Sequence, residues 1–417
     1  MVTPLGKDPR EVLRRIEASE SAAAPPKRFD ASPFACPVCA EVKDFRPQDY
    51  VAEPKMIRLM NRDAQLAVAA AHLALQDARL RVGTDYPPEE IALFGATGLA
   101  GLPLAEVTAL IKNSATPDGR FDDKKFGARG LRSISPLLSF KVLGNMPVCF
   151  VSICENIQGP NCIYTPWEGQ GAQAIEAGLR AIQCGDARCA LVGGCDVKMH
   201  ELAFISLEQL GLFRSWKETG KGIVPGEGAV FLVLEEEALA AARGARAYAR
   251  LVDWDLENRR CRSNAGPAAG GLVARLLGRC VPPHPGPLPR GEGESSPSPE
   301  QDSRHGLLPT PQTVLPLPKG EGRGEGEGDR RGSLRALVSA ADEAFSSRHD
   351  EVQTMASAGV AIESVLCPKS QVGNLFAAAA ALQVGLGALL AERLGGTVLA
   401  HCSGHGSDPA AFLLEPA

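Results

Sequence analysis

The chain has 417 residues with 44 basic and 49 acidic side chains, and 44% of its residues are apolar. This length exceeds one ordinary domain, and the net charge of −5 excludes the basic surface typical of nucleic-acid-binding proteins. The sequence contains no continuous apolar run of about 18 residues, so it predicts no membrane span. Twelve cysteines are too few for the disulfide framework of a secreted domain, so we expect a cytoplasmic α/β protein with reduced thiols.

Helical and strand patterns alternate along most of the sequence. Apolar residues at helical spacing predict four helices, over residues 57–77, 171–184, 237–243 and 375–393. Short apolar runs predict three strands, over residues 90–98, 188–194 and 229–235. This alternation indicates helices that cover the faces of sheets, in two halves that divide near residue 250.

One segment, residues 281–331, differs in composition from the rest of the chain. It is rich in proline, glycine, serine and charge, and the sequence Leu288–Glu294 returns with small changes at Leu317–Arg323. Such a composition cannot bury enough apolar surface to offset the entropy lost on ordering. We therefore expect a disordered insert within the second half.

Four segments carry a resemblance to a known family. Gly159-Pro-Asn161 precedes a turn and the helix 171–184, and Val224–Glu235 includes a glycine-led strand. Lys369-Ser-Gln-Val-Gly-Asn374 enters the alanine-rich helix, and Ser403-Gly-His-Gly-Ser407 precedes the last strand. In this order, over nearly the whole chain except the insert, they resemble the motifs of β-ketoacyl-ACP synthases.

The resemblance implies a thiolase-like fold in which two similar α/β halves, residues 1–250 and 251–417, stack in α-β-α-β-α layers with the site between them. It also implies a dimer. In that family a cysteine at the start of a helix, where its thiolate is stabilised, accepts the acyl group from acyl carrier protein. Two histidines then assist decarboxylation and condensation by stabilising oxygen atoms that become negative.

The sequence departs from that pattern at each catalytic position. Counting from either side places Glu168 where the nucleophilic cysteine belongs, and Asn374 replaces the second histidine. The segment Val352–Gly359, taken as the region of the first histidine, contains none. Gln383 replaces a carboxylate that the family has fourteen residues after the lysine. These positions predict that no catalytic side chain of the condensing machinery is intact.

The same substitutions predict a new contact. Lys369 is kept, while one carboxylate near it is lost at Gln383 and another is gained at Glu168. Because a buried lysine needs a negative partner, we expect Glu168 to pair with Lys369 directly or through one water, filling the space of the absent acyl-cysteine. On this basis, Glu168→Gln should cost about 1–3 kcal/mol of stability.

Three further groups have both a functional and a structural interpretation. Cys162, six residues before Glu168, is either a displaced nucleophile or, as we favour, a packed thiol. Cys36-Pro-Val-Cys39 is an isolated pair without the four ligands that zinc needs, so packing is the better interpretation. His405 either lines a remnant substrate pocket or is structural. We expect no cofactor and no metal.

The favoured function is a non-condensing ketosynthase-like subunit, similar to the chain-length factors of polyketide and aryl-polyene systems. Such a protein pairs with an active ketosynthase, or with itself, in fatty acid or polyketide biosynthesis, with acyl carrier protein as a further partner. The alternatives are a divergent acyltransferase or malonyl decarboxylase with relocated residues, and a homologue without function. We expect neither nucleic acid nor membrane as a partner.

The N-terminus carries one more expectation. The family begins with a strand ahead of the segment that resembles Val2–Gly6. We therefore expect either a start upstream of Met1 or a first sheet with one vacant strand position.

Overall fold

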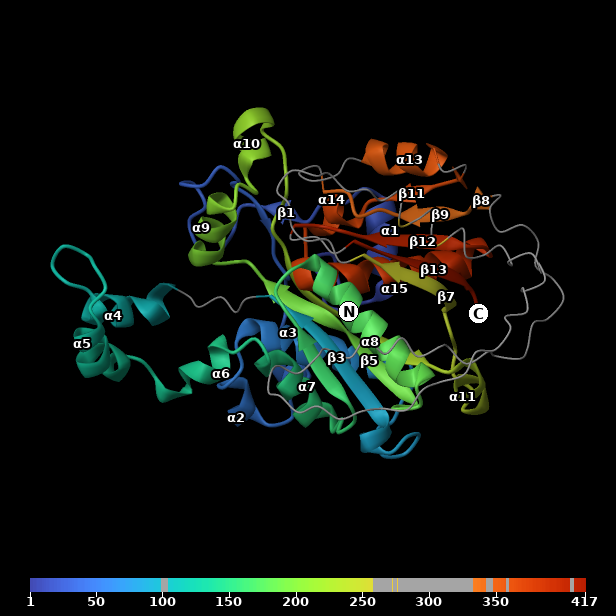
Figure 1. The fold of residues 1–417 in the computed structure, drawn as a ribbon, viewed down its shortest axis with the longest axis horizontal. Coiled ribbons are helices and arrows are strands. Elements are labelled where there is room, and N and C mark those ends of the chain that lie inside the picture. Colours follow the sequence, from blue (N-terminus) through green and yellow to red (C-terminus); the bar gives the residue numbers. More distant parts are fainter. Residues whose placement is uncertain are drawn as a thin grey trace, which may run out of the picture.

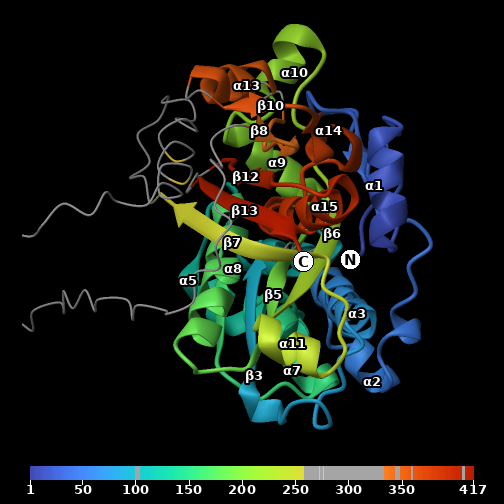
Figure 2. The ribbon, with the colours of Figure 1, turned by 90° about the vertical axis from the view of Figure 1, so that its right-hand side faces the viewer.

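The computed structural model of the protein describes residues 1–98, 104–257, 272, 276, 333–342, 348–357, 360–405 and 409–417. Two β-sheets lie one above the other, with helices between them and on their outer faces (Figures 1 and 2). The predicted insert, residues 281–331, falls outside the described part of the chain.

The first sheet has the strand order β4-β3-β5-β6. Its strands are β3 (Ile91–Thr97), β4 (Asn161–Tyr164), β5 (Cys189–Val197) and β6 (Glu227–Glu235). β3 is parallel to β4 and to β5, whereas β6 is antiparallel to β5. β3 and β5 are buried along their whole length, as expected for strands covered on both faces.

The second sheet repeats this arrangement with one strand more. Its order is β11-β9-β12-β13-β7, from β7 (Ala249–Leu256), β9 (Ala336–Val338), β11 (Val365–Leu366), β12 (Val398–Cys402) and β13 (Ala410–Pro416). β9 is parallel to β11 and β12, and β13 is antiparallel to both β12 and β7. Strand by strand, the first sheet therefore matches the second except at the position of β7.

The position that corresponds to β7 is vacant in the first sheet. Among the described residues, only the isolated antiparallel bridge between Val2 and Ala229 lies on that edge of β6. Backbone hydrogen bonds of 2.7 and 2.9 Å join these two residues in both directions. This edge is the place for which the sequence predicts either a vacant strand position or a start upstream of Met1.

Two core helices that contact each other fill the space between the sheets. They are α8 (Glu168–Gln183) and α15 (Ala379–Leu394), which follows the single 3₁₀ turn η6 (Phe376–Ala378). Their alanines and glycines allow close approach, since a Cβ added to Gly171 would lie 2.7 Å from the carbonyl oxygen of Ala377. The largest core cluster joins both helices to the inner faces of both sheets.

Outer helices complete the five layers that the thiolase-like resemblance implies. α3 (Arg62–Asp77) and α7 (Met146–Glu155) pack together on the first sheet in a second core cluster. Met355 of α13 (Arg348–Ser357), with Leu272 and Leu276, packs on Leu399 and Leu413 of the second sheet. The α-β-α-β-α order predicted from the resemblance is thus confirmed.

The remaining elements of the body are short and surround these layers. Its helices and 3₁₀ turns are α1 (Pro9–Glu17), η1 (Pro47–Asp49), α2 (Pro54–Ile57), η2 (Pro88–Glu90), α9 (Glu201–Gln209), α10 (Arg214–Thr219), α11 (Glu237–Ala242) and α14 (Pro368–Val372). Its small strands are β1 (Ala23–Ala24), β2 (Cys39–Ala40), β8 (Ser333–Leu334) and β10 (Ala361–Ile362).

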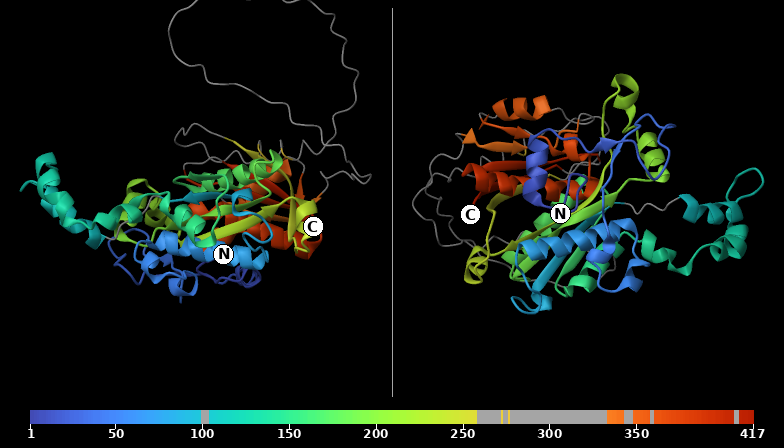
Figure 3. Two further views of the ribbon diagram at one scale, coloured as in Figure 1. Left: turned by 90° about the horizontal axis from the view of Figure 1, so that it is seen from below. Right: turned by 180° about the vertical axis from the view of Figure 1, so that it is seen from behind.

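Residues 104–143 form an arm that projects from the body (Figures 1 and 3). The arm contains α4 (Leu104–Ser114), α5 (Asp123–Lys125), the π-helical turn η3 (Phe126–Gly130), η4 (Leu131–Ser133), η5 (Pro136–Leu138) and α6 (Ser139–Val142). α4 packs mainly on α5, η3 and η4, which belong to the arm itself. At its base, the side chain of Asn61 donates a 2.9 Å hydrogen bond to the Lys141 carbonyl.

The predicted elements all appear, with small shifts at their ends. The largest shift is in the first helix, predicted over 57–77, because Asn61 caps α3 through a hydrogen bond to the Ala64 N–H and separates it from α2. In the described chain, the helical run Phe376–Leu394 is long and apolar enough to cross a membrane. Its apolar window is 72% buried, as expected of a core helix between two sheets.

Two buried carboxylates, Asp196 and Asp63, interact electrostatically with each other beside the turn into α15. Asp196 in β5 forms an ion pair with Lys198 and accepts the Ala377 N–H at 3.4 Å. Asp63 in α3 accepts a 3.1 Å hydrogen bond from Asn61. Burial, and next the charge of Asp196, raise the pKa of Asp63 to about 8.

This raised pKa predicts an unusual pH dependence. Because the unfolded chain releases the Asp63 proton near its ordinary pKa of 3.8, folding takes up a proton between that pKa and about 8. The free energy of unfolding should therefore fall as the pH rises from about 5 to 8, by up to about 1.4 kcal/mol per pH unit from this group. Asp63→Asn, which has no proton to take up, should flatten the curve in urea denaturation.

The control for this experiment is Asp49→Asn, because the Asp49 side chain is 49% exposed to solvent. That variant should keep the wild-type slope. Equal slopes in wild type and Asp63→Asn would contradict the prediction.

Candidate functional site

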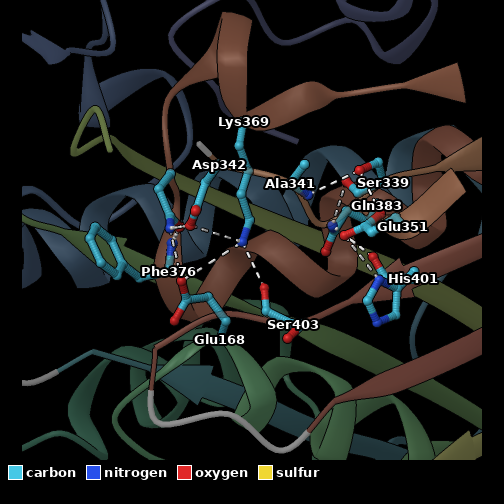
Figure 4. Close-up of polar contacts among 11 residues, drawn as sticks. Glu168, Ser339, Ala341, Asp342, Glu351, Lys369, Phe376, Gln383, His401 and Ser403 are labelled. Atoms are coloured by element: carbon cyan, nitrogen blue, oxygen red, sulfur yellow. Dashed lines mark hydrogen bonds and ion pairs between the residues drawn. The ribbon is translucent and has the colours of Figure 1, made fainter. Parts of the chain in front are cut away.

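Two helix starts from opposite halves of the chain meet between the sheets. Glu168 is the first residue of α8, and Asn374 comes directly before the turn into η6 and α15. Lys369 projects from α14 and Asp342 from the segment after β9 (Figure 4). Glu168 is 1% exposed, and the other three side chains are also buried.

Hydrogen bonds and charges join these four side chains. The Asn374 amide donates to Glu168 Oε1 at 2.8 Å and to Asp342 Oδ2 at 3.4 Å. Lys369 Nζ lies 3.8 Å from Glu168 Oε1 and 3.8 Å from Asp342 Oδ2, and it donates a 2.7 Å hydrogen bond to the Ser403 carbonyl. The predicted contact between Glu168 and Lys369 is therefore present in the structure, together with a second carboxylate.

The pKa of the Glu168 carboxyl group is subject to opposing effects. Burial raises the pKa of its carboxyl group, against the attraction of Lys369 and the hydrogen bond from Asn374. Its Oε1 is engaged, whereas its buried Oε2 has no hydrogen-bond partner among the described residues. Gly404 leaves room for it, since a Cβ at that position would lie 2.2 Å from the carboxylate. The carboxylate therefore occupies the space that a side chain at position 404 would need.

A second buried network lies beside the first (Figure 4). Gln383 of α15 donates from its amide to the carbonyl oxygens of Ser339 at 3.1 Å and His401 at 2.9 Å. Glu351 of α13 accepts a 2.6 Å hydrogen bond from the Ser339 hydroxyl, and its Oε1 lies 3.2 Å from His401 Nδ1. Gln383, predicted at the site, thus ties β9 to β12.

Glu351 supplies negative charge near Lys369 from a part of the chain that the sequence did not indicate. Burial opposes its ionisation, but His401, the Ser339 hydroxyl and Lys369 together lower its pKa. It is an acidic group close to the position where the family carboxylate has become Gln383.

The position assigned to the first family histidine needs correction. Residues 352–357 belong to α13 on the outer layer, and residues 358–359 lie outside the described chain. The segment that follows a strand and reaches Lys369 is instead Ser339–Asp342, after β9. It also contains no histidine. The sequence does mark this segment, because Ser339-Ala-Ala-Asp342 directly follows an apolar run. The low-complexity residues 281–331 lie just before that run and separate it from the motifs of the first half.

A cavity of about 380 Å³ opens against these side chains. Its lining residues are Ser21, Trp216, Lys221, Gly222, Val224, Asp342, Lys369, Ser370 and Asn374. His405 is not among its lining residues. The imidazole packs edge-on against the Trp167 ring, with 4.8 Å between centroids, and burial lowers its pKa.

None of the described cysteines lies in the cavity beside Glu168 as a replacement nucleophile. Cys162 lies exposed on β4, and no described cysteine lines the cavity. Cys36 and Cys39 are both free and buried, and burial raises the pKa of each thiol to about 12. Among the described residues, no three His, Cys, Asp or Glu side chains are grouped as a metal site.

Sequence comparison identifies the family. The pattern of the β-ketoacyl synthase N-terminal domain matches residues 1–240, more than half of the chain. The chain belongs to the β-ketoacyl synthase family. It is 27% identical to 3-oxoacyl-[acyl-carrier-protein] synthase 2 of Synechocystis sp. over 264 residues, which cover 61% of this chain and 60% of that protein. The synthase 2 of Staphylococcus aureus is 26% identical, with the same coverage. The match thus spans about three fifths of these relatives.

Solved structures share the fold over the whole chain. The ishigamide ketosynthase/chain length factor superposes with a TM-score of 0.72 at 18% identity, covering 100% of this chain and 97% of that one. A β-ketoacyl synthase from Burkholderia phymatum gives a TM-score of 0.71 at 17% identity, with the same coverage. A type II polyketide ketosynthase, solved with its acyl carrier protein, gives 0.67 at 13%, covering 100% and 96%.

Because Glu168 and Asp342 share the ammonium group of Lys369, we expect the effects of their substitutions on stability to be strongly coupled. Glu168→Gln or Asp342→Asn alone leaves Lys369 one negative partner, so each should change stability by less than about 1 kcal/mol. This replaces the larger cost expected for Glu168→Gln from sequence alone. The double variant leaves the buried lysine without either carboxylate and should lose about 3–5 kcal/mol in urea denaturation.

A triple variant provides the control. Adding Lys369→Met removes the unpaired charge, so most of the lost stability should return. Additive effects of the two single substitutions would contradict the coupling.

Proposed function

We propose that this β-ketoacyl synthase family member is a non-condensing subunit of the chain-length-factor type, which pairs with an active ketosynthase in fatty acid or polyketide biosynthesis. The observation that carries this proposal is the buried Glu168 at the start of α8, bonded to Asn374 and 3.8 Å from Lys369. A carboxylate held in this way is a poor nucleophile and forms no acyl thioester.

The surrounding groups support the same conclusion. Asn374 cannot exchange a proton as a histidine does, and its amide is already bonded to Glu168 and to the Phe376 N–H. The segment Ser339–Asp342 offers a carboxylate where condensation needs a donor to a developing negative oxygen. A negative group at that point would oppose the enolate. Among the described residues, the site therefore has neither the cysteine nor the histidines that the family uses for condensation.

One observation favours the alternative of a divergent decarboxylase or acyltransferase. Lys369 and Asn374 line the cavity, and both carry N–H donors that could polarise a thioester carbonyl. Release of CO₂ from malonyl-acyl carrier protein by the purified chain alone would favour this function over the non-condensing role.

A reconstitution experiment tests the proposed function. The chain, an intact ketosynthase from the same genome, and acyl- and malonyl-loaded carrier protein are combined, and the chain length of the ketoacyl product is measured by mass spectrometry. We expect no product from the chain alone and an altered product length when both subunits are present. As a control, replacing the ketosynthase cysteine with alanine should abolish the product.

Restoring the nucleophile alone should not restore condensation. Glu168→Cys creates a thiol at the helix start, but Asn374 and the Ser339–Asp342 segment still provide no histidine for decarboxylation. We expect acylation of the new thiol at most and no ketoacyl product. Condensation by Glu168→Cys, or by the wild-type chain without another subunit, would contradict the proposed function.

A further inference from the structure

A cleft of about 650 Å³ opens where the helices α3, α7 and α11 end. Residues from the last turns of α3 and α7, from the turn 79–85 and from the end of α11 line it. It shares no lining residue with the cavity beside Lys369. A volume of this size is typical of sites that bind small molecules.

Three arginines line the cleft, and two of them already have carboxylate partners. Arg243 donates a 2.7 Å hydrogen bond to Glu235, and Arg81 lies 3.3 Å from Asp85. Arg79 is exposed, and in the described part of the chain no carboxylate forms an ion pair with it. The cleft therefore holds one guanidinium group that is free to bind an anionic group.

Glu155 gives the cleft a carboxylate without a cationic partner. Its Oε1 lies 3.1 Å from His72 Nδ1, and its side chain is 13% exposed. The Gln76 amide nitrogen, which can only donate, lies 2.9 Å from His72 Nε2, so the imidazole is neutral and carries its proton on Nδ1. Burial raises the pKa of the Glu155 carboxyl group, and the interaction with His72 opposes the rise.

The position of Glu155 in its helix adds to this imbalance. It is the last residue of α7, and the last turn of that helix contains no basic residue. The end of a helix carries partial negative charge from its free carbonyl groups, so a carboxylate is unfavourable there and a cation is favourable. This end of the cleft is therefore suited to an ammonium group.

The two charges without partners lie at opposite ends of the cleft. His72, which contacts Glu155, precedes Arg79 by seven residues, a rise of about 10 Å along the direction of α3. Leu75 and Leu80, which also line the cleft, come between these positions or directly after them in the sequence. The cleft thus offers a negative end, an apolar part and a positive end.

We propose that this cleft binds a short linear peptide as a zwitterion, with the peptide ammonium group on Glu155 and the peptide carboxylate on Arg79. An extended chain covers at most about 3.5 Å per residue, so three residues span the distance of about 10 Å. An apolar side chain in the middle of the peptide then faces Leu75 and Leu80. The inference does not depend on the proposed function, because the cleft and the buried site share no residue.

The test measures binding of the tripeptide Gly-Leu-Gly to the full chain by calorimetry. Acetylation of its amino group or amidation of its carboxyl group removes one charge, and each change should weaken binding by about 10-fold or more. Glu155→Gln should weaken binding of the free tripeptide by about 10-fold and leave binding of the acetylated one within about 3-fold of wild type. Arg79→Met should show the same pattern with the amidated tripeptide.

Matched control variants change the same residue types outside the cleft. Glu218 and Arg132 are both exposed, and neither lines the cleft. Glu218→Gln and Arg132→Met should therefore bind Gly-Leu-Gly within about 2-fold of wild type. Circular dichroism of all four variants establishes that the fold is kept.

A cysteine in the cleft reports where the peptide binds. Cys154 lines the cleft and is half-buried, whereas Cys162 and Cys184 are exposed outside it. At a Gly-Leu-Gly concentration about ten times the Kd, alkylation of Cys154 by N-ethylmaleimide should slow by up to about 10-fold. Alkylation of Cys162 and Cys184, followed by mass spectrometry in the same sample, should keep its rate.

Three results would overturn the inference. The first is the absence of saturable binding of Gly-Leu-Gly to the wild-type chain. The second is binding that Glu155→Gln and Arg79→Met leave unchanged, or that does not slow alkylation of Cys154. The third is equal binding of the acetylated or amidated tripeptide, which would mean that only one charge is recognised. The reconstitution with a ketosynthase tests the proposed function separately, so each can fail while the other stands.

Discussion

A buried ammonium group between two carboxylates organises the centre of this protein. Lys369 lies 3.8 Å from both Glu168 and Asp342, and all three are withdrawn from water. An isolated charge at such a position would be lost to proton transfer or would destabilise the fold. Because the three groups come from α8, from α14 and from the segment after β9, their pairing fixes the two halves of the chain relative to each other.

The near-repetition of the two sheets explains why the site lies at this point. Each half directs the start of one core helix toward the other, which brings Glu168 at α8 close to Asn374 before α15. Small residues let these helices approach, as at Gly171 against Ala377. The vacant position beside β6 is the one place where the first sheet does not match the second. It lies at the edge of the sheet, and α8 and α15 still pack between the two sheets.

The buried site and the exposed arm differ in how their side chains are partnered. Glu168 accepts a hydrogen bond from Asn374 and lies 3.8 Å from Lys369, so it gives both side chains a buried negative partner. The arm, by contrast, exposes apolar and basic groups that nothing in the described chain covers.

The sequence by itself determined which stretches are helices and which are buried strands, as in 171–184 and 229–235, because the two differ in apolar periodicity. The order of the layers came from the family resemblance. With the family resemblance it also predicted that Glu168 approaches Lys369. It did not reveal Asp342 or Glu351, since neither residue belongs to the four motifs that carry the resemblance. Their role depends on which side chains share a low-dielectric interior. Only the tertiary structure decides that, because burial and charge pairing are set by neighbours that lie far apart along the chain.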